Sequence, residues 1–492
     1  MTESGTAPDD TSDRLVTLLQ PVLAASIPGF DELLSAERLS GGASQETYRL
    51  TARIAGATRP LALRRAAGGE TGAAEGRPGL AVEAMLMQVA AAAGVPEPTV
   101  HAVLDPDLGL GDGFVMEWLD GHTLGARIVR APELDEIRPR LAYQCGQILA
   151  RIHAIDPVTT GLAEHLTVMP TSEFITEMWN QYIEMGTPQP MIDFTARWLL
   201  DNCPETTEPR VVHNDFRNGN LMVSAVDGVT GVLDWEVCHL GDPMRDLGWI
   251  CTNSWRFGRR DLPVGGFGHY NDLFAGYEAE SGEPVDREHV HFWEVFGSFW
   301  WAIGCLKMAD HWRHGPDPSV ERPGIARRSS ECQVDCVNLL IPGPVDLVVP
   351  GTDHARGSSI DMPSTGELVT SVRDFLRTEV MASTEGRTNF MARVAANSLD
   401  IVLRELDLTR AHLTAERTRL GALVGRGGND GMPDLESQRW GLVKALRRDE
   451  IDRTRPDLHH HLRSTVVNQV AIDQPRYSGY LAAIATAEEM SP

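Results

Sequence analysis

Four polar residues have the types and the spacing that phosphoryl transfer needs. His213, Asp215 and Asn220 lie in a polar loop between two short apolar runs, so the pattern predicts a strand, a loop and a second strand. A second acid, Asp234, follows another short apolar run nineteen residues after Asp215. One Asp can accept a hydroxyl proton, while the Asn and the second Asp can hold Mg²⁺ for in-line transfer. Other elements must then supply a nucleotide site and hold these side chains in place.

A small-residue turn far upstream has the composition of a loop that covers phosphates. It runs from Leu39 to Ser44, between two segments of strand-like composition. Backbone N–H groups at Gly41, Gly42 and Ser44 are suited to contact nucleotide phosphates. The turn does not match GxGxxG, and most turns of this composition are ordinary hairpin loops. Both interpretations stay open at this point.

The next predicted strand, Leu61–Arg65, would present a cation to the phosphates. The candidate is Arg64 or Arg65, and for Arg65 a solvated charge at the strand end is the alternative. A helix predicted over 79–93 carries Glu83 near its start. There the carboxylate can pair with the strand cation or simply favour the positive end of the helix dipole. We favour the pair.

A hinge between two lobes is predicted near residue 120. Strands are expected over 100–103 and 113–118, and Glu117 and Trp118 close this strand-rich region before the turn at Asp120-Gly121. Exposed backbone at such a hinge can bind the edge of an adenine ring.

The region after the hinge is predicted to be helical. Apolar spacing indicates helices over 134–153 and 178–200. Asp246 follows a tight turn, and we expect it to support the catalytic loop or cap a helix rather than act in catalysis. The aromatic residues of 292–303 recur at helical spacing, which is more typical of a core than of a substrate cage.

The charge of the chain excludes some partners. The 492 residues carry 44 Lys and Arg against 69 Asp and Glu, a net charge of -25. Residues 361–492 contain 17 basic and 19 acidic residues, so nearly all of the excess belongs to the first 360. This argues against nucleic acid or an anionic membrane surface as a partner. It permits a cationic substrate without requiring one.

Several features predict a cytoplasmic protein. The seven cysteines are scattered and odd in number, which fits free thiols in a reducing compartment. The polar, acidic start of the chain is unlike a signal peptide, and no apolar run reaches the 18 residues typical of a membrane span.

The length predicts two or three domains. We expect a disordered segment over 1–12, one lobe over 13–119, a second lobe over 120–341, a Pro/Gly/Ser-rich linker over 342–364 and a helical domain over 365–492. Within the last part, helical spacing is found over 368–380, 390–408, 414–424, 433–449 and 455–472.

Taken in order, these parts resemble the aminoglycoside phosphotransferase and choline kinase-like family, over roughly residues 15–340. The chain looks closest to the kinase-like domains associated with acyl-CoA dehydrogenases. The resemblance is carried by Leu39–Ser44, Leu63–Arg65, Phe114–Trp118, His213–Asn220 and Leu233–Glu236. Residues from about 365 resemble a helical domain of uncharacterised function that is attached to such phosphotransferases.

The resemblance implies ATP and Mg²⁺ as cofactors. Asp215 matches the catalytic base, which His213 would support from within the loop, and Asn220 and Asp234 match the metal ligands. The nucleotide-binding positions correspond to Gly41, Gly42, Ser44, Arg64, Glu83, Glu117 and Trp118. Arg64 stands where the broad family has Lys, and an Arg is usual in the subgroup associated with acyl-CoA dehydrogenases.

We therefore predict an α+β fold, two-lobed and protein-kinase-like, followed by an all-α C-terminal domain. The predicted activity is ATP- and Mg²⁺-dependent transfer of the γ-phosphate to a small-molecule hydroxyl, with a hydroxyacyl compound favoured as the acceptor. An aminoglycoside-type kinase and a nucleotide-binding pseudokinase that regulates a partner are the alternatives. Neither nucleic acid nor a membrane is expected to bind, and a homodimer through the C-terminal domain is expected.

Overall fold

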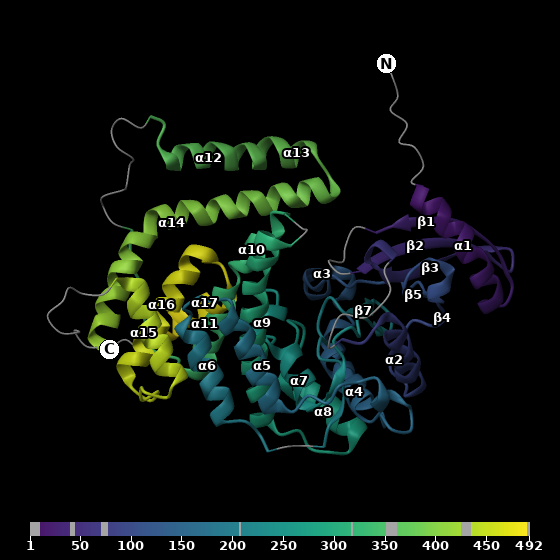
Figure 1. The fold of residues 1–492 in the computed structure, drawn as a ribbon, viewed down its shortest axis with the longest axis horizontal. Helices are drawn as coiled ribbons and strands as arrows, with labels where there is room; N and C mark the ends of the chain where they lie inside the picture. The colour runs from purple at the N-terminus through teal and green to yellow at the C-terminus, as the bar shows by residue number, and fades with distance from the viewer. Residues whose placement is uncertain are drawn as a thin grey trace.

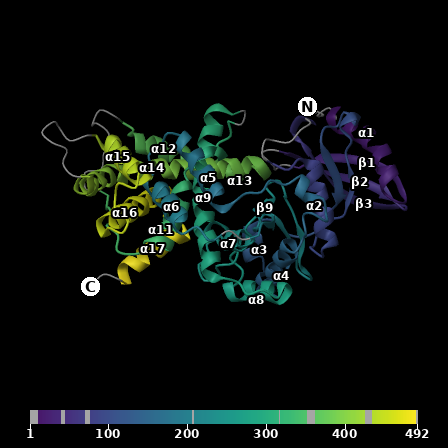
Figure 2. The same cartoon turned by 60° about the horizontal axis from the view of Figure 1, so that its bottom comes forward.

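The computed structural model describes residues 10–39, 45–69, 77–205, 208–315, 318–350, 362–424 and 434–489. Three parts follow one another along its longest axis (Figure 1): a strand-rich lobe, a mainly helical lobe, and the helices that end the chain. The same order is seen after a 60° rotation (Figure 2). The predicted fold class, an α+β kinase-like architecture followed by a helical region, is confirmed.

The first lobe is a five-stranded antiparallel sheet of order β1-β2-β3-β5-β4. Its strands are β1 (Phe30–Arg38), β2 (Gln45–Ile54), β3 (Ala57–Ala66), β4 (Val100–Val103) and β5 (Gly113–Glu117). Helix α1 (Asp10–Ser26) buries Leu15, Leu19 and Leu23 in one core with the sheet residues Leu50 and Leu63. Helix α2 (Leu80–Ala92) instead belongs to the core that the two lobes share. The sheet is thereby covered by α1 and joined through α2 to the second lobe.

The predicted hinge lies close to a strand of the second lobe. His122 exchanges backbone hydrogen bonds with Val223, at 2.9 and 3.0 Å. A Cβ on Gly121 would lie 2.7 Å from the Val223 carbonyl oxygen, so only glycine allows this close approach. The hinge is therefore fixed directly to the strand that follows the catalytic loop.

The second lobe is mainly helical. Its helices are α3 (Gly125–Arg130), α4 (Leu141–His153), α5 (Thr171–Glu184), α6 (Pro190–Asp201), α7 (Met244–Cys251), α8 (Tyr270–Ser281), α9 (Arg287–His314), α10 (Glu321–Ala326) and α11 (Ser329–Leu340). Two small antiparallel pairs complete it: β6 (Arg210–Val212) with β9 (His239–Gly241), and β7 (Leu221–Ser224) with β8 (Gly228–Val232). These two pairs hold the loop that contains Asp215.

Three predicted segments are corrected by the structure. Residues 134–140 are not helical as predicted, because prolines 132 and 139 limit this stretch to 3₁₀ turns before α4. The helix predicted over 178–200 is two helices, separated at Gly186, which has a φ of 62°. Residues 10–12, predicted to be disordered, begin α1, while residues 1–9 lie outside the described part.

The C-terminal helices pack on the second lobe. They are α12 (Thr365–Phe375) with a π turn at Leu376–Val380, α13 (Met381–Ser383), α14 (Gly386–Val424), α15 (Leu435–Arg447), α16 (Pro456–Asp473) and α17 (Ser478–Glu489). Helix α14 is continuous where two helices were predicted, and α12 runs along its first half (Figure 1). Phe194 of α6 and Val334 of α11 share one core with Leu420 and Val467. This shared core joins the last helices to the kinase-like part.

The predicted linker is only partly a free connection. Residues 342–350 have no regular secondary structure, but they lie along α16. The Asp346 N–H donates to Ser464 Oγ at 3.1 Å, and the Val348 N–H donates to Asn468 Oδ1 at 2.8 Å. Residues 351–361 of the predicted linker lie outside the described part.

Among the described helices, none has both the length and the apolar character to cross a bilayer.

Replacing Gly146 with Ala is expected to destabilise the second lobe. Its Cβ would lie 2.1 Å from the Leu273 carbonyl oxygen and 2.6 Å from the Tyr277 nitrogen, because α4 and α8 cross closely here. Overpacking of this kind costs about 2 kcal/mol. We expect a thermal unfolding midpoint at least about 4 °C lower.

The matched control is Gly366→Ala in α12, where a Cβ would meet no atom within 4 Å. This change should leave the midpoint unchanged or raise it slightly, since Ala favours a helix over Gly. Equal midpoints for the Gly146 variant and the unmodified chain would contradict the packing argument.

Candidate active site

The Asp215 carboxylate is held by three side chains of the second lobe. Oδ1 accepts hydrogen bonds from Trp249 Nε1 at 2.8 Å and from Arg217 Nε at 2.9 Å. Oδ2 accepts one from Asn220 Nδ2 at 2.6 Å. The carboxylate is thus oriented by hydrogen bonds and partly open to solvent, as a proton acceptor must be.

His213 supports the loop from inside, as predicted. Its Nδ1 accepts the Asp215 N–H at 3.2 Å, so Nε2 carries the proton and donates to the Leu233 carbonyl at 3.1 Å. The ring is fully buried and packs on Trp235 with centroids 4.6 Å apart. Burial lowers the pKa of His213, so the imidazole is neutral and positions the loop without adding charge.

Asp246 anchors the backbone of the same loop. Its oxygens accept the His213 N–H at 2.8 Å and the Asn214 N–H at 2.7 Å, and His153 Nε2 lies 3.2 Å away. Burial opposes ionisation, but the hydrogen bond and charge of His153, together with His213, hold the pKa of Asp246 below its usual value. The prediction of a supporting role for Asp246 is confirmed, and His153 is a buried structural histidine.

Arg245 supports this anchor from the opposite side. Its Nε donates to Asn214 Oδ1 at 3.0 Å, which helps to hold Asn214 at a φ of 65°. The guanidinium is fully buried and lies over four aromatic rings, those of Trp249, Trp293, Phe296 and Trp300, at 4.7 to 5.9 Å from their centroids. Burial lowers the pKa of Arg245 to about 9.

Arg64 is the strand cation that faces the site. Its guanidinium forms ion pairs with Asp234 and, at 3.3 Å, with Glu83 of α2. Burial alone would lower the pKa of Arg64, but the carboxylates of Glu83 and Asp234 raise it. The predicted pair between Glu83 and the strand cation is confirmed, and it reaches across both lobes to Asp234.

Arg65 points to the other face of β3, because successive residues of a strand alternate. Its Nε donates to Glu46 Oε2 at 2.8 Å, and the guanidinium lies 5.2 Å from the centroid of the Tyr48 ring. Arg65 therefore belongs to the sheet, and Arg64 is the residue suited to bind phosphates.

Asn220 and Asp234 lie at the same end of the β7–β8 pair, where Leu221 faces Val232, and their oxygens fit a hard divalent cation. The Asn220 nitrogen is committed to Asp215, which leaves its oxygen as the available ligand atom. The carboxylates of Asp234, Glu83 and Glu236 lie near the guanidinium of Arg64, and Arg77 also pairs with Glu236 at 3.3 Å. Mg²⁺ takes few protein oxygens when phosphates supply the others.

The other predicted nucleotide-binding residues are only partly described. Gly41, Gly42 and Ser44 lie outside the described residues. Glu117 ends β5, where its side chain accepts hydrogen bonds from Thr99 N and Oγ1 at 3.2 and 3.0 Å. Trp118 donates to Asp120 Oδ1 at 3.2 Å. Both are next to the hinge, and their role in binding a nucleotide stays a prediction.

Comparison with known families agrees with this arrangement. The profile of the phosphotransferase enzyme family matches residues 35–282, which is half of the chain. The chain belongs to the phosphotransferase enzyme family. The profile of a domain of unknown function, DUF6285, matches residues 382–477. The first match contains the site described above, and the second contains most of the C-terminal helices.

Relatives of this phosphotransferase include parts of larger proteins. Acyl-CoA dehydrogenase family member 10 of Mus musculus is 30% identical over 247 residues, 49% of this chain and 22% of that protein. Family member 11 of Gallus gallus is 28% identical over 162 residues, 32% of this chain and 20% of that protein. The chain thus spans about a fifth of the length of these two relatives.

A solved structure supports the fold of this family member. It is a Ralstonia eutropha JMP134 protein with a provisional assignment as an aminoglycoside phosphotransferase. The TM-score is 0.53 at 22% identity, covering 64% of this chain and 95% of that one. Family and fold together are those of a small-molecule kinase-type phosphotransferase.

Two contributors to the phosphotransferase site were missed from the sequence. Arg217 and Trp249 both contact the Asp215 carboxylate. Arg217 also lies over the ring of Trp255, 4.3 Å from its centroid. A basic residue two positions after the catalytic acid was the one available signal; Trp249 gave none, because its contact depends on how α7 packs.

The aromatic stripe over 292–303 forms a core, as predicted. Trp293, Phe296 and Phe299 are buried, and Trp300 is half-buried and packs against the same cluster. Trp300 also packs on Trp249, with ring centroids 4.8 Å apart. The core therefore supports the indole that donates to Asp215.

Glu83 should make stability depend on pH near neutrality. Burial first, and then Asp234 and Glu236, raise the pKa of Glu83 to about 7, although Arg64 opposes this. Because the pKa of Glu83 is higher in the folded state, the free energy of unfolding falls as the pH rises from the unfolded pKa, 4.5, to the folded pKa. Between pH 6 and pH 8 this loss is about 1 kcal/mol.

Glu83→Gln should remove that dependence. We expect the thermal unfolding midpoint of the variant, relative to that of the unmodified chain, to be higher at pH 8 than at pH 6. Both values lie above the isoelectric point near 5.0. A difference that is the same at both pH values would contradict a titrating Glu83.

Proposed function

We propose that the chain transfers the γ-phosphate of ATP to a hydroxyl group of a small hydroxyacyl compound, with Mg²⁺ as the metal. The observation that carries the proposal is the Asp215 carboxylate, fixed by Trp249 and Asn220 at the junction of the two lobes. A base held in this way can orient an acceptor hydroxyl and take its proton.

The other residues would divide the remaining tasks. Arg64 would contact the nucleotide phosphates, and Glu83 would keep its guanidinium pointed into the site. Asn220 and Asp234 would hold Mg²⁺, which neutralises phosphate charge when bound. Because His213 and Asp246 bind only backbone and buried groups, they would position Asp215 without touching the substrate.

Arg217 supports an acidic acceptor. Its guanidinium is stacked on Trp255 and bonded to Asp215 through Nε, while its side chain is still 24% exposed. A cation beside the base repels a polycationic aminoglycoside and attracts a carboxylate. The apolar rings of Trp255 and Trp300 would contact the carbon chain of such an acceptor.

The relatives point in the same direction. Two of them are named as acyl-CoA dehydrogenase family members. A kinase acting on a hydroxyacyl group would use the same class of carbon skeleton. The alternative of a pseudokinase would be supported by ATP binding without turnover of any hydroxy acid, choline-like alcohol or aminoglycoside.

Asp215→Asn should abolish phosphoryl transfer and spare nucleotide binding. The substitution keeps the shape of the side chain and removes the proton acceptor, so turnover should fall by about 10²- to 10⁴-fold. ATP affinity in the presence of Mg²⁺, measured by calorimetry, should change by less than about threefold.

Asp227→Asn is the control, since Asp227 is an exposed acid in the turn between β7 and β8. It should keep full activity in an assay of ADP release with a panel of hydroxy acids. Activity that survives Asp215→Asn would rule out the assigned base.

Arg217→Gln should reduce the preference for acidic acceptors. We expect kcat/KM for a hydroxy fatty acid to fall at least about tenfold more than kcat/KM for the diol of the same length, because only the acid has a carboxylate. Dividing kcat/KM for the acid by kcat/KM for the diol cancels any loss of activity that both substrates share because Arg217 also contacts Asp215.

Arg140→Gln, at an exposed arginine of the same lobe, should leave this ratio unchanged. An equal loss for acid and diol would show that Arg217 acts only on Asp215.

Association into a homodimer through the C-terminal helices stays a prediction.

A further inference from the structure

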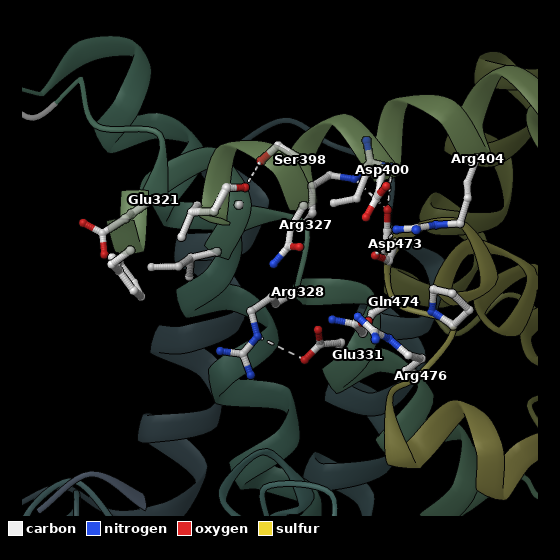
Figure 3. A pocket seen from close by; sticks show the side chains of 17 residues that line it. Glu321, Arg327, Arg328, Glu331, Ser398, Asp400, Arg404, Asp473, Gln474 and Arg476 are labelled. Atoms are coloured by element: carbon white, nitrogen blue, oxygen red, sulfur yellow. Dashed lines mark hydrogen bonds and ion pairs between the residues drawn. The ribbon is translucent and has the colours of Figure 1, made fainter. Parts of the chain in front are cut away.

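A cavity lies where the C-terminal helices meet the kinase-like part (Figure 3). Its volume is about 300 Å³, the lower end of the range for ligand-binding cavities, roughly 300–1,000 Å³. The wall consists of α10, the start of α11, the first half of α14 and the turn after α16. None of the residues assigned above to phosphoryl transfer lines it.

Every carboxylate in the wall of this cavity already has an arginine partner. The pairs are Glu321 with Arg387, Glu331 with Arg328, Asp400 with Arg373 and Arg377, and Asp473 with Arg327. The distances are 3.3 Å for Glu321 and 3.0 Å for Glu331. The acids of the wall are thus neutralised within the protein and leave no charge for a cationic ligand.

Two arginines of the wall form no ion pair with an acid in the part of the chain that the structure describes. Arg404 Nη2 donates to the backbone carbonyl of Asp473 at 3.0 Å, and its Nε donates to that of Ile472. Arg476 makes no hydrogen bond or ion pair with any part of the chain that the structure describes, and it is exposed at the edge of the cavity. Burial and the nearby cations Arg476 and Arg327 lower the pKa of Arg404, although Asp400 and Asp473 oppose this.

A third arginine of the wall, Arg328, has one bonded nitrogen within the described residues, Nε, which donates to Glu331 Oε2 at 3.0 Å. In Figure 3 Arg328 and Arg476 lie on either side of Glu331. The wall therefore presents guanidinium groups with unused donors.

Other residues of the wall are apolar. They are Ile325 of α10 and Phe390, Val394 and Ile401 of α14. Phe390 is 39% exposed, so its ring is open to a bound molecule. Guanidinium groups and apolar side chains together make the wall amphipathic.

We propose that this cavity binds an anionic amphiphile, a carboxylate or phosphate group borne on a short alkyl chain. The anion would bind Arg476, Arg404 and Arg328 through charge-assisted hydrogen bonds, and the chain would lie along Ile401 and Val394. Fatty carboxylates and alkyl phosphates share this chemistry. The site is separate from the proposed acceptor site, so it holds whether or not the proposed activity is correct.

Isothermal titration calorimetry of the full chain with octanoate and with octyl phosphate tests the proposal. We expect saturable binding of one of these probes, and which one binds identifies the anion. Inorganic phosphate and 1-octanol should each bind at least about tenfold more weakly, because each has only half of the required chemistry. Absence of binding by both anionic probes, or equal binding of 1-octanol, would overturn the proposal.

Arg476→Glu should weaken binding of the anionic probe at least about tenfold. The variant should fold normally, because the side chain is exposed and makes no hydrogen bond or ion pair with the described part of the chain. Arg417→Glu, at an exposed arginine of α14 outside the cavity, reverses the same charge and should leave the affinity unchanged. Binding that survives Arg476→Glu but is lost in Arg217→Gln would assign the probe to the acceptor site and overturn the proposal.

Discussion

The buried carboxylate of Asp246 holds the catalytic loop in place. It accepts two consecutive backbone N–H groups, those of His213 and Asn214, and a third bond involves His153 of α4. Asn214 has a left-handed backbone, which costs energy unless neighbouring groups fix it. Loss of Asp246 would leave two buried N–H groups without acceptors, and the next residue is Asp215. The position of the Asp215 carboxylate therefore depends on this buried ion.

Arg64 connects this loop to the nucleotide side. Its guanidinium forms ion pairs with Glu83 of α2 and with Asp234 of the second lobe. One side chain of the sheet is therefore bonded to the second lobe as well. The neighbouring Arg65 is bound within the sheet by Glu46. Because the two arginines point to opposite faces of β3, a shift of one residue in register would exchange their roles.

The C-terminal helices also support the site. Asp335 of α11 accepts hydrogen bonds from Asn253 Nδ2 at 2.7 Å and from the Tyr477 hydroxyl at 2.6 Å. Asn253 begins the short turn that contains Trp255, the ring on which Arg217 is stacked. Farther along, Arg447 of α15 pairs with the buried Asp193 of α6 at 2.7 Å. These contacts, together with the shared core, make the last helices part of the scaffold that supports Trp255 and Arg217.

The sequence by itself determined the order along the chain of the strands and helices in the strand-rich lobe, because this order depends on local spacing. It also identified Asp215, Asn220 and Asp234 as one group of polar residues, because each follows a predicted strand or lies in the short loop between two. It also indicated the pair between Glu83 and a strand cation, but not which arginine forms it. Only the tertiary structure decided that Arg64 reaches Asp234, 170 positions away, and that Trp249 bonds to Asp215. It also revealed the cationic cavity, whose wall joins residues of α10 and α16. Such contacts depend on helix packing between distant segments, which periodicity within one segment does not specify.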